Sequence, residues 1–137
     1  MSTVGGIVPA RLDHTIMHST DSTASARFLT HLLGAPDPEP FGPFVAVPVE
    51  GGLTIDYADF IVQPDQIVMQ HLAFLVSEEE FDGIYARVRE SDLPYWSDPG
   101  HQGPRQLNHR SGGRGLYVDD PDGHAIEFLT VSEGPGS

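Results

Sequence analysis

The sequence predicts a single α+β domain built from two similar modules, whose strands form one curved, partly open sheet with the helices on its convex side. Three observations predict this class. The order strand, helix, strands occurs twice in 137 residues, at about 11–60 and about 68–131. Each helix has clear start and stop signals, and the length suits one compact domain over 11–131. The Gly-, Ser- and Pro-rich ends, residues 1–10 and 132–137, are expected to be flexible.

The first module begins with a strand in which apolar and polar residues alternate. A helix is expected over 21–33, because Asp21 or Ser22 can cap its start and Gly34 ends it. The pair Gly51-Gly52 is typical of a hairpin turn between two further strands. The strands expected in this module are Arg11–His18, Phe44–Val49 and Leu53–Phe60.

The second module repeats this order. The segment Ser77–Glu80 is a capping-box sequence that predicts a helix running to about Ser91, and Pro94 closes it. The tetrad Asp120–Gly123 predicts a tight turn between the last two strands. The strands expected here are Val68–Val76, Arg105–Arg110, Gly113–Asp119 and His124–Val131.

A glutamate in the middle of an apolar strand is the feature with most chemical content. Glu127 alternates with Ile126 and Phe128, so it faces away from the side that these two residues pack against. A carboxylate in such a strand is expensive to bury without a partner. His14 and His71 occupy equally strand-like segments. Two imidazoles and one carboxylate on separate strands are the components of an open divalent-metal site.

Composition excludes several function classes. The net charge is -13 with 7 Lys plus Arg, which argues against nucleic acid and anionic membranes as partners. The chain contains no cysteine, so it has neither disulfides nor a thiol nucleophile. It also shows no apolar run long enough to span a membrane and no secretory signal, so a cytoplasmic location is expected.

Three motifs together point to a known family. They are LDH at 12–14, QHLAF at 70–74 and GLYVDDPDGHAIEF at 115–128. With them the chain resembles the vicinal oxygen chelate superfamily, which includes glyoxalase I, fosfomycin- and bleomycin-resistance proteins and extradiol dioxygenases. The resemblance implies paired βαβββ modules. It also implies one divalent ion (Fe, Mn, Zn, Ni or Co) held by His14, His71 and Glu127.

The resemblance has further implications for the site. Tyr117 is expected to donate a hydrogen bond to a metal-bound oxygen, as a tyrosine does in extradiol dioxygenases. Independently of the resemblance, His18 shares strand parity with His14 and is a candidate acid/base group near the ion. Glyoxalase I enzymes carry a fourth ligand in a strand where this chain has Asp56 and Asp59, whose shorter side chains do not match it. A homodimer is implied as well, with the metal site either inside one chain or shared between two.

Other residues are candidates for binding the substrate. Trp96 follows the second helix and is expected to wall the pocket. A polar cluster comprises Asn108, His109, Arg110 and Arg114, and Arg114 is a candidate to hold an anionic group. Three further histidines, at 31, 101 and 124, are expected at the surface.

The preferred function is therefore that of a metal-dependent enzyme acting on a small oxygenated metabolite. Both glyoxalase-like isomerase or lyase chemistry and ring-cleaving dioxygenase chemistry fit the ligand set. The alternative is a binding protein that sequesters an antibiotic or natural product without catalysis. The chain has no lysine, which argues against the lysine-dependent phosphonate binding of fosfomycin-resistance enzymes.

Overall fold

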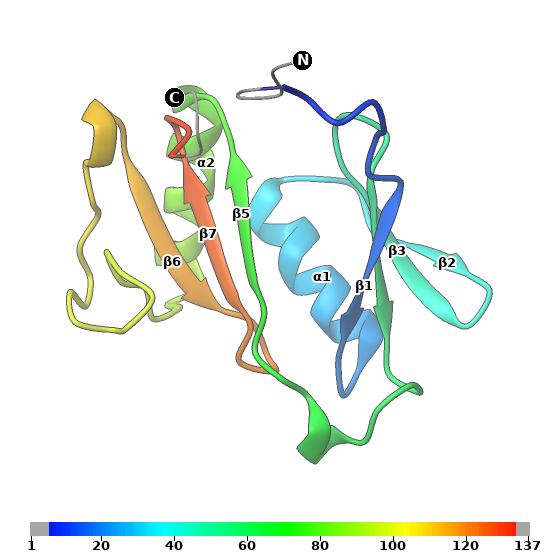
Figure 1. Ribbon diagram of the computed structural model, residues 1–137. Helices are drawn as coiled ribbons and strands as arrows, with labels where there is room; N and C mark the ends of the chain where they lie inside the picture. The colour runs from blue at the N-terminus through cyan, green and yellow to red at the C-terminus, as the bar shows by residue number, and fades with distance from the viewer. Residues whose placement is uncertain (1–5, 134–137) are drawn as a thin grey trace.

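A computed structural model describes residues 6–133 of the chain (Figure 1). Two α-helices and seven strands follow one another in two modules. The expectation of flexible ends falls partly on residues 1–5 and 134–137, which lie outside the described residues. The first module contains β1 (His14–His18), α1 (Ser22–Leu33), β2 (Glu39–Phe41), β3 (Phe44–Pro48) and β4 (Thr54–Ala58). The second contains β5 (His71–Leu75), α2 (Glu78–Glu90), β6 (Gly115–Asp119) and β7 (Ala125–Leu129), and short 3₁₀ turns occur at Pro64–Gln66 and Arg110–Gly112.

Each module folds its strands into a small mixed sheet. The strand order is β1-β4-β3-β2 in the first sheet and β5-β7-β6 in the second. In both sheets the first strand pairs in parallel with the last strand of its module, and the other pairs are antiparallel. The paired-module fold is therefore confirmed. The strands form two open sheets in which β1 and β5 are edge strands, and α1 is seen between these two strands in Figure 1.

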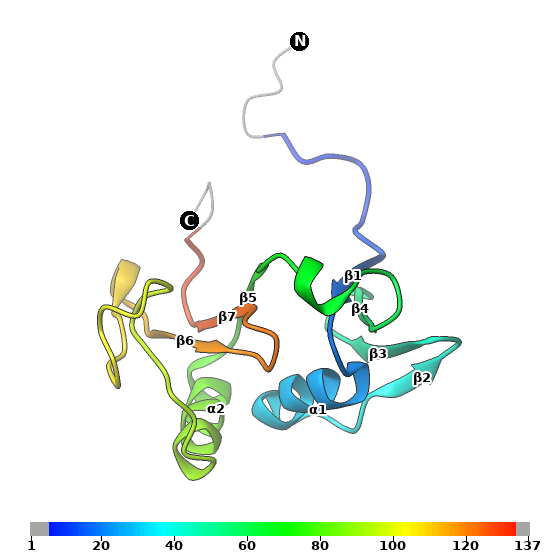
Figure 2. The same cartoon turned by 90° about the horizontal axis from the view of Figure 1, so that it is seen from below.

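Both helices lie on the same side of the two sheets (Figure 2). The predicted strand parity explains this arrangement. Ile126 and Phe128 of β7 are fully buried in one core with Phe81 and Ile84 of α2. Because side chains alternate along a strand, Glu127 is directed to the opposite, helix-free face.

The predicted helix boundaries are confirmed by their caps. The Ala24 amide donates to the Asp21 carboxylate at the start of α1 over 3.1 Å. Gly34 ends α1 with a φ of 68°, a left-handed conformation that glycine adopts without steric cost. At the start of α2, Ser77 and Glu80 form the predicted capping box, with reciprocal bonds of 3.0 and 2.7 Å.

The strand predicted at Arg105–Arg110 is absent. Asn108 makes a single bridge with Gly115, and the chain then turns through the 3₁₀ segment at 110–112. Arg105 and Ser111 both have positive φ values, 58° and 54°. Because β-structure requires negative φ, the chain leaves the strand conformation at the first residue of the predicted range and again just after its last one.

His124 is also placed differently from the prediction. It was expected at the surface, but it is fully buried at the start of β7. Its Nδ1 accepts the Gln70 amide at 2.9 Å, and its Nε2 donates to the His18 carbonyl at 2.8 Å. These two bonds satisfy both ring nitrogens, which makes burial of the imidazole possible.

Hydrogen bonds connect the two modules near the start of α1. Asp122, in the turn before β7, accepts hydrogen bonds from the Thr20 amide at 3.1 Å and the Thr20 hydroxyl at 2.8 Å. It also accepts one from the Ser25 hydroxyl at 3.2 Å. At the other end of α1, Arg87 of α2 donates from Nε to the Leu32 carbonyl at 2.9 Å. The polar contacts at both ends of α1 thus fix the first module against the second.

Asp122→Ala is expected to lower the free energy of unfolding by about 1–2 kcal/mol, because three donors of the first module lose a charged acceptor. Urea denaturation of the variant measures this change. The matched control is Asp65→Ala, which removes an exposed carboxylate in the 3₁₀ turn between the modules and should leave stability within about 0.5 kcal/mol. Equal stability of the two variants would contradict the importance of the Asp122 contacts.

Candidate functional site

Three side chains from the second sheet form the centre of the candidate site. Tyr117 on β6 lies directly opposite Glu127 on β7, and His71 begins the neighbouring strand β5. The His71 imidazole Nε2 is 2.9 Å from the Glu127 Oε1. The Glu127 side chain is 6% exposed and that of His71 is 44% exposed. The imidazole therefore covers the carboxylate and forms its accessible side.

The second oxygen of Glu127 is the unusual feature of this group. Oε2 is buried and has no hydrogen-bond partner. A buried carboxylate oxygen normally has a donor or a cation beside it, since the free energy cost of removing it from water is large. Glu127 is one of the residues that line a cleft of about 370 Å³, together with His71, Ala73, Leu75, Tyr117, Leu129, Ser132 and Glu133.

Tyr117 is held by contacts on two sides. Its ring packs edge-to-face on the His71 ring, with centroids 5.5 Å apart, and its hydroxyl oxygen accepts a bond of 3.2 Å from Arg110 Nη1. Burial raises the pKa of Tyr117, the Arg110 bond opposes that rise, and the charge of Glu127 adds to it. Because the net shift is upward, the phenol stays protonated at neutral pH and its O–H remains a donor.

His14 lies on the other sheet, in the edge strand β1. Its Nδ1 donates to the Asp13 carboxylate at 2.7 Å, and this bond raises the pKa of His14. Among residues 6–133 no group of three His, Cys, Asp or Glu side chains is placed to hold a metal ion. The structure of this one chain thus brings His71 and Glu127 together and leaves His14 apart.

The first sheet carries polar groups of its own. Asp56 on β4 is 4% exposed, and its Oδ1 has no hydrogen-bond partner. His18, at the end of β1, has a buried Nδ1 that is likewise without a partner. Neither residue is part of the cleft beside Tyr117. The Asp59 carboxylate accepts a hydrogen bond of 3.1 Å from the Ser22 amide and so stabilises the start of α1.

The predicted substrate-binding residues are dispersed. Arg114 bonds Glu78 and Asp82 of α2, each at 2.8 Å, and so lies on the helix side of the sheet. The Trp96 ring stacks on His101 at 3.7 Å and borders a different, mostly apolar cleft. The Asn108 amide donates to the Ser97 carbonyl at 2.9 Å.

Arg110, rather than Arg114, is the member of the predicted polar cluster that reaches the site. It contacts Tyr117, as described above, and Glu133 at 3.6 Å. His109, the residue before it, is exposed. Four polar residues within seven positions identify the loop in sequence. Ser111, the residue after Arg110, has a left-handed conformation with a φ of 54°, and the residue types give no signal of that conformation.

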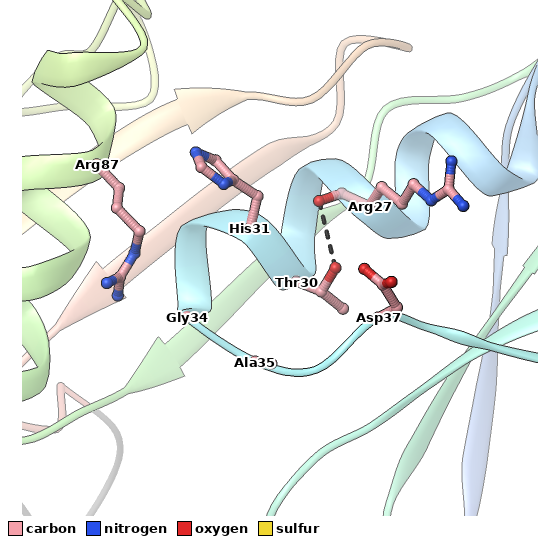
Figure 3. Close-up of a pocket in the computed structure, with 7 residues that line it drawn as sticks. All are labelled: Arg27, Thr30, His31, Gly34, Ala35, Asp37 and Arg87. Carbon is pink, nitrogen blue, oxygen red and sulfur yellow. Dashed lines mark hydrogen bonds between the residues drawn. The ribbon is translucent and has the colours of Figure 1, made fainter.

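A larger cleft of about 490 Å³ lies between the two helices (Figure 3). Arg87 and His31 point into the gap from α2 and α1, while Arg27 points away from it. Thr30 bonds the backbone of its own helix, and Arg87 is engaged by the Leu32 carbonyl. The polar groups of Thr30 and Arg87 in this cleft therefore stabilise the C-terminal end of α1.

Comparison with known proteins places these features in context. The solved structure of oxidase ChaP-H1 is 48% identical, with a TM-score of 0.86, and the match covers 91% of this chain and 98% of that one. Oxidase ChaP-H2 is 45% identical, with a TM-score of 0.86, and the match covers 95% of this chain and all of that one.

A curated relative matches over a shorter stretch. Glutathione transferase FosA of Serratia marcescens is 31% identical over 76 residues, which is 56% of this chain. The match spans about half of that relative's length, 47%.

No helix within residues 6–133 is long and apolar enough to cross a membrane. The family profile described as Glyoxalase/Bleomycin resistance protein/Dioxygenase superfamily matches residues 11–128, which include all three predicted metal ligands. The two modules, the motifs at their first and last strands, and this match lead to one conclusion. The chain belongs to the glyoxalase/bleomycin resistance protein/dioxygenase superfamily.

Proposed function

We propose that this protein is a metal-dependent oxidase acting on a small molecule that presents two neighbouring oxygen atoms. The observation that carries the proposal is the buried, unpartnered Oε2 of Glu127 beside His71. The two oxidases that match more than nine tenths of the chain at 45–48% identity support oxygen chemistry. Glutathione transfer is less well supported, because the FosA match covers about half of either protein.

The residues of the second sheet fit a divalent ion. An imidazole nitrogen and a carboxylate oxygen are the donors of the two-histidine, one-carboxylate sites that hold Fe(II) in oxygenases, and Mn, Co, Ni and Zn accept the same set. His71 and Glu127 would hold the ion. Once bound, it would supply a Lewis-acid centre at which a substrate and dioxygen can meet.

We further propose that a second copy of the chain supplies the remaining histidine. The edge strands β1 and β5 border an apolar groove of about 390 Å³, lined on its two sides by residues such as Leu12 and Leu72. Unpaired edges and exposed apolar side chains such as Leu75, which is 62% exposed, favour association. In a two-fold dimer, His14 of each copy would complete the site of the other.

The chain's own residues have distinct roles in this proposal. Tyr117 keeps its proton at neutral pH and donates it in a hydrogen bond to a substrate oxygen. Ala73, Leu75 and Leu129 form an apolar wall that limits access of water to the reacting atoms. His71 covers Glu127 and keeps the carboxylate available to the ion.

The protein purified without chelators is expected to contain about one divalent ion per chain, and Glu127→Gln should lose it, because the amide carries no charge to offset the desolvated cation. Elemental analysis and titration with Fe(II), Mn(II) and Zn(II) provide the measurement. Glu90→Gln removes the same charge at the exposed end of α2 and should retain the ion. Retention of the ion by Glu127→Gln would refute the site.

Mixed dimers test whether the site is shared. His14→Ala and Glu127→Gln chains, co-expressed with different tags, form a dimer in which one site carries both changes and the other carries neither. Such a dimer should bind one ion with wild-type affinity, while each parent homodimer binds none at that affinity. Failure of the mixed dimer to regain any site would show that the ligands come from one chain.

Oxidase activity predicts dioxygen consumption. When the metal-loaded protein is incubated with a panel of catechols and hydroxyquinones, oxygen-electrode traces should show uptake that stops in Glu127→Gln and falls by about 10²–10³-fold in Tyr117→Phe. Uptake should also stop on chelation. A ligand that binds equally well after metal removal, without oxygen uptake, would instead favour the sequestering alternative.

A further inference from the structure

Arg110 contacts two of the residues that line the cleft, Tyr117 and Glu133. Its Nη1 lies 3.2 Å from the Tyr117 hydroxyl and 3.6 Å from the Glu133 carboxylate. The Tyr117 bond raises the pKa of Arg110, and the charges of Glu133 and Glu127 add to the rise. Through Tyr117 and Glu133, the guanidinium lies beside the cleft that the Glu127 carboxylate also lines.

The contact with Glu133 is loose. Both side chains are about one third to two fifths exposed, at 41% for Arg110 and 34% for Glu133. An exposed pair of this kind contributes only about 0.2–1 kcal/mol. Arg114, by contrast, is held by two carboxylates at 2.8 Å each. A guanidinium has five N–H donors, so Arg110 has capacity for a further oxyanion.

Glu133 also stands in the cleft itself. It lines the wall next to Ser132, on the segment that follows β7. Its carboxylate therefore lies where an anionic group of a bound molecule would meet Arg110. The chain has a net charge of -13, and Glu127 adds negative charge to the cleft, so an anionic ligand needs a local cation.

We propose that Arg110 binds a carboxylate group of the substrate and that Glu133 is an internal carboxylate which this group displaces. The inference rests on the proposed function and makes it more specific: the substrate combines neighbouring oxygens with an anionic group several ångströms away. Arg110 is then a specificity-determining residue, and Glu133 weakens the binding of an anionic ligand by competing with it for the guanidinium.

The test uses benzoate and benzamide, which share size and shape and differ in charge. The full chain is labelled with ¹⁵N-arginine, and its arginine side-chain NMR signals are recorded. The signal of Arg110 is assigned as the one that is missing from the spectrum of the Arg110→Gln variant. Benzoate should shift this signal saturably, and benzamide should not. Glu133→Gln should tighten benzoate binding about two- to five-fold, because a competing ion pair is removed.

Two controls separate a local effect from a change in total charge. Glu90→Gln removes a negative charge from α2 and should leave benzoate affinity unchanged, and the Arg89 signal should not move. The proposal is overturned if benzoate leaves the Arg110 signal in place or if benzamide shifts it equally. It is also overturned if Glu133→Gln binds benzoate no more tightly than Glu90→Gln does.

The titration is performed with metal-free and zinc-loaded protein. Benzoate capture at Arg110 should occur in both, since the guanidinium is not a metal ligand. Failure of metal binding would therefore refute the proposed oxidase without altering the Arg110 result. An unmoved Arg110 signal in a protein that does bind zinc would refute the anion site alone.

Discussion

The burial of one carboxylate sets the constraint on which the site depends. Glu127 is placed at the centre of β7 by the same alternation that sends Ile126 and Phe128 into the core, so the fold cannot release it without disrupting the packing of α2. His71 satisfies one of its oxygens and leaves the other unpartnered. The free energy cost of that unpartnered oxygen is borne by the apolar contacts on the opposite face of the same strand. A cation at Glu127 would offset it, and this links the stability of the second module to the occupancy of the site.

The two modules share a topology but differ in how they hold polar groups. In the second sheet the functional side chains contact one another: Tyr117 packs on His71, which covers Glu127. In the first sheet His14 is paired with the adjacent Asp13, and the nearest buried carboxylate, Asp56, keeps an unpartnered oxygen. Half of the candidate site is therefore preorganised within the chain. The remaining member of the proposed ligand set, His14, lies on the first sheet, apart from His71 and Glu127.

The sequence predicted most of the fold because its signals are local. Asp21, Gly34 and the Ser77–Glu80 box fix helix ends through bonds within a few residues, and strand parity follows from alternation alone. Long-range contacts explain the failures. His124 is buried because Gln70 and His18, distant in sequence, satisfy its ring, and no neighbouring residue indicates this. The loop at 105–112 depends on positive φ at Arg105 and Ser111, residue types that rarely adopt it. For the same reason the sequence selected Arg114 for the anion, whereas Arg110 lies beside the cleft.

The arginines of this acidic chain differ in how fully other protein groups already occupy their donors. Of the seven arginines, Arg114 is neutralised by two carboxylates of α2, and Arg87 serves the end of α1. Arg110 differs in being shared between a phenol and a single, distant carboxylate. Arg110 donates to the hydroxyl of Tyr117, which lies opposite Glu127 in the sheet. A group bound by Arg110 would therefore also influence the orientation of the Tyr117 hydroxyl hydrogen. Recognition of an anion and orientation of the Tyr117 proton are thus coupled through one hydrogen bond. The Arg110 guanidinium therefore acts on the candidate site through its hydrogen bond to Tyr117 and not through a direct contact with the Glu127 carboxylate.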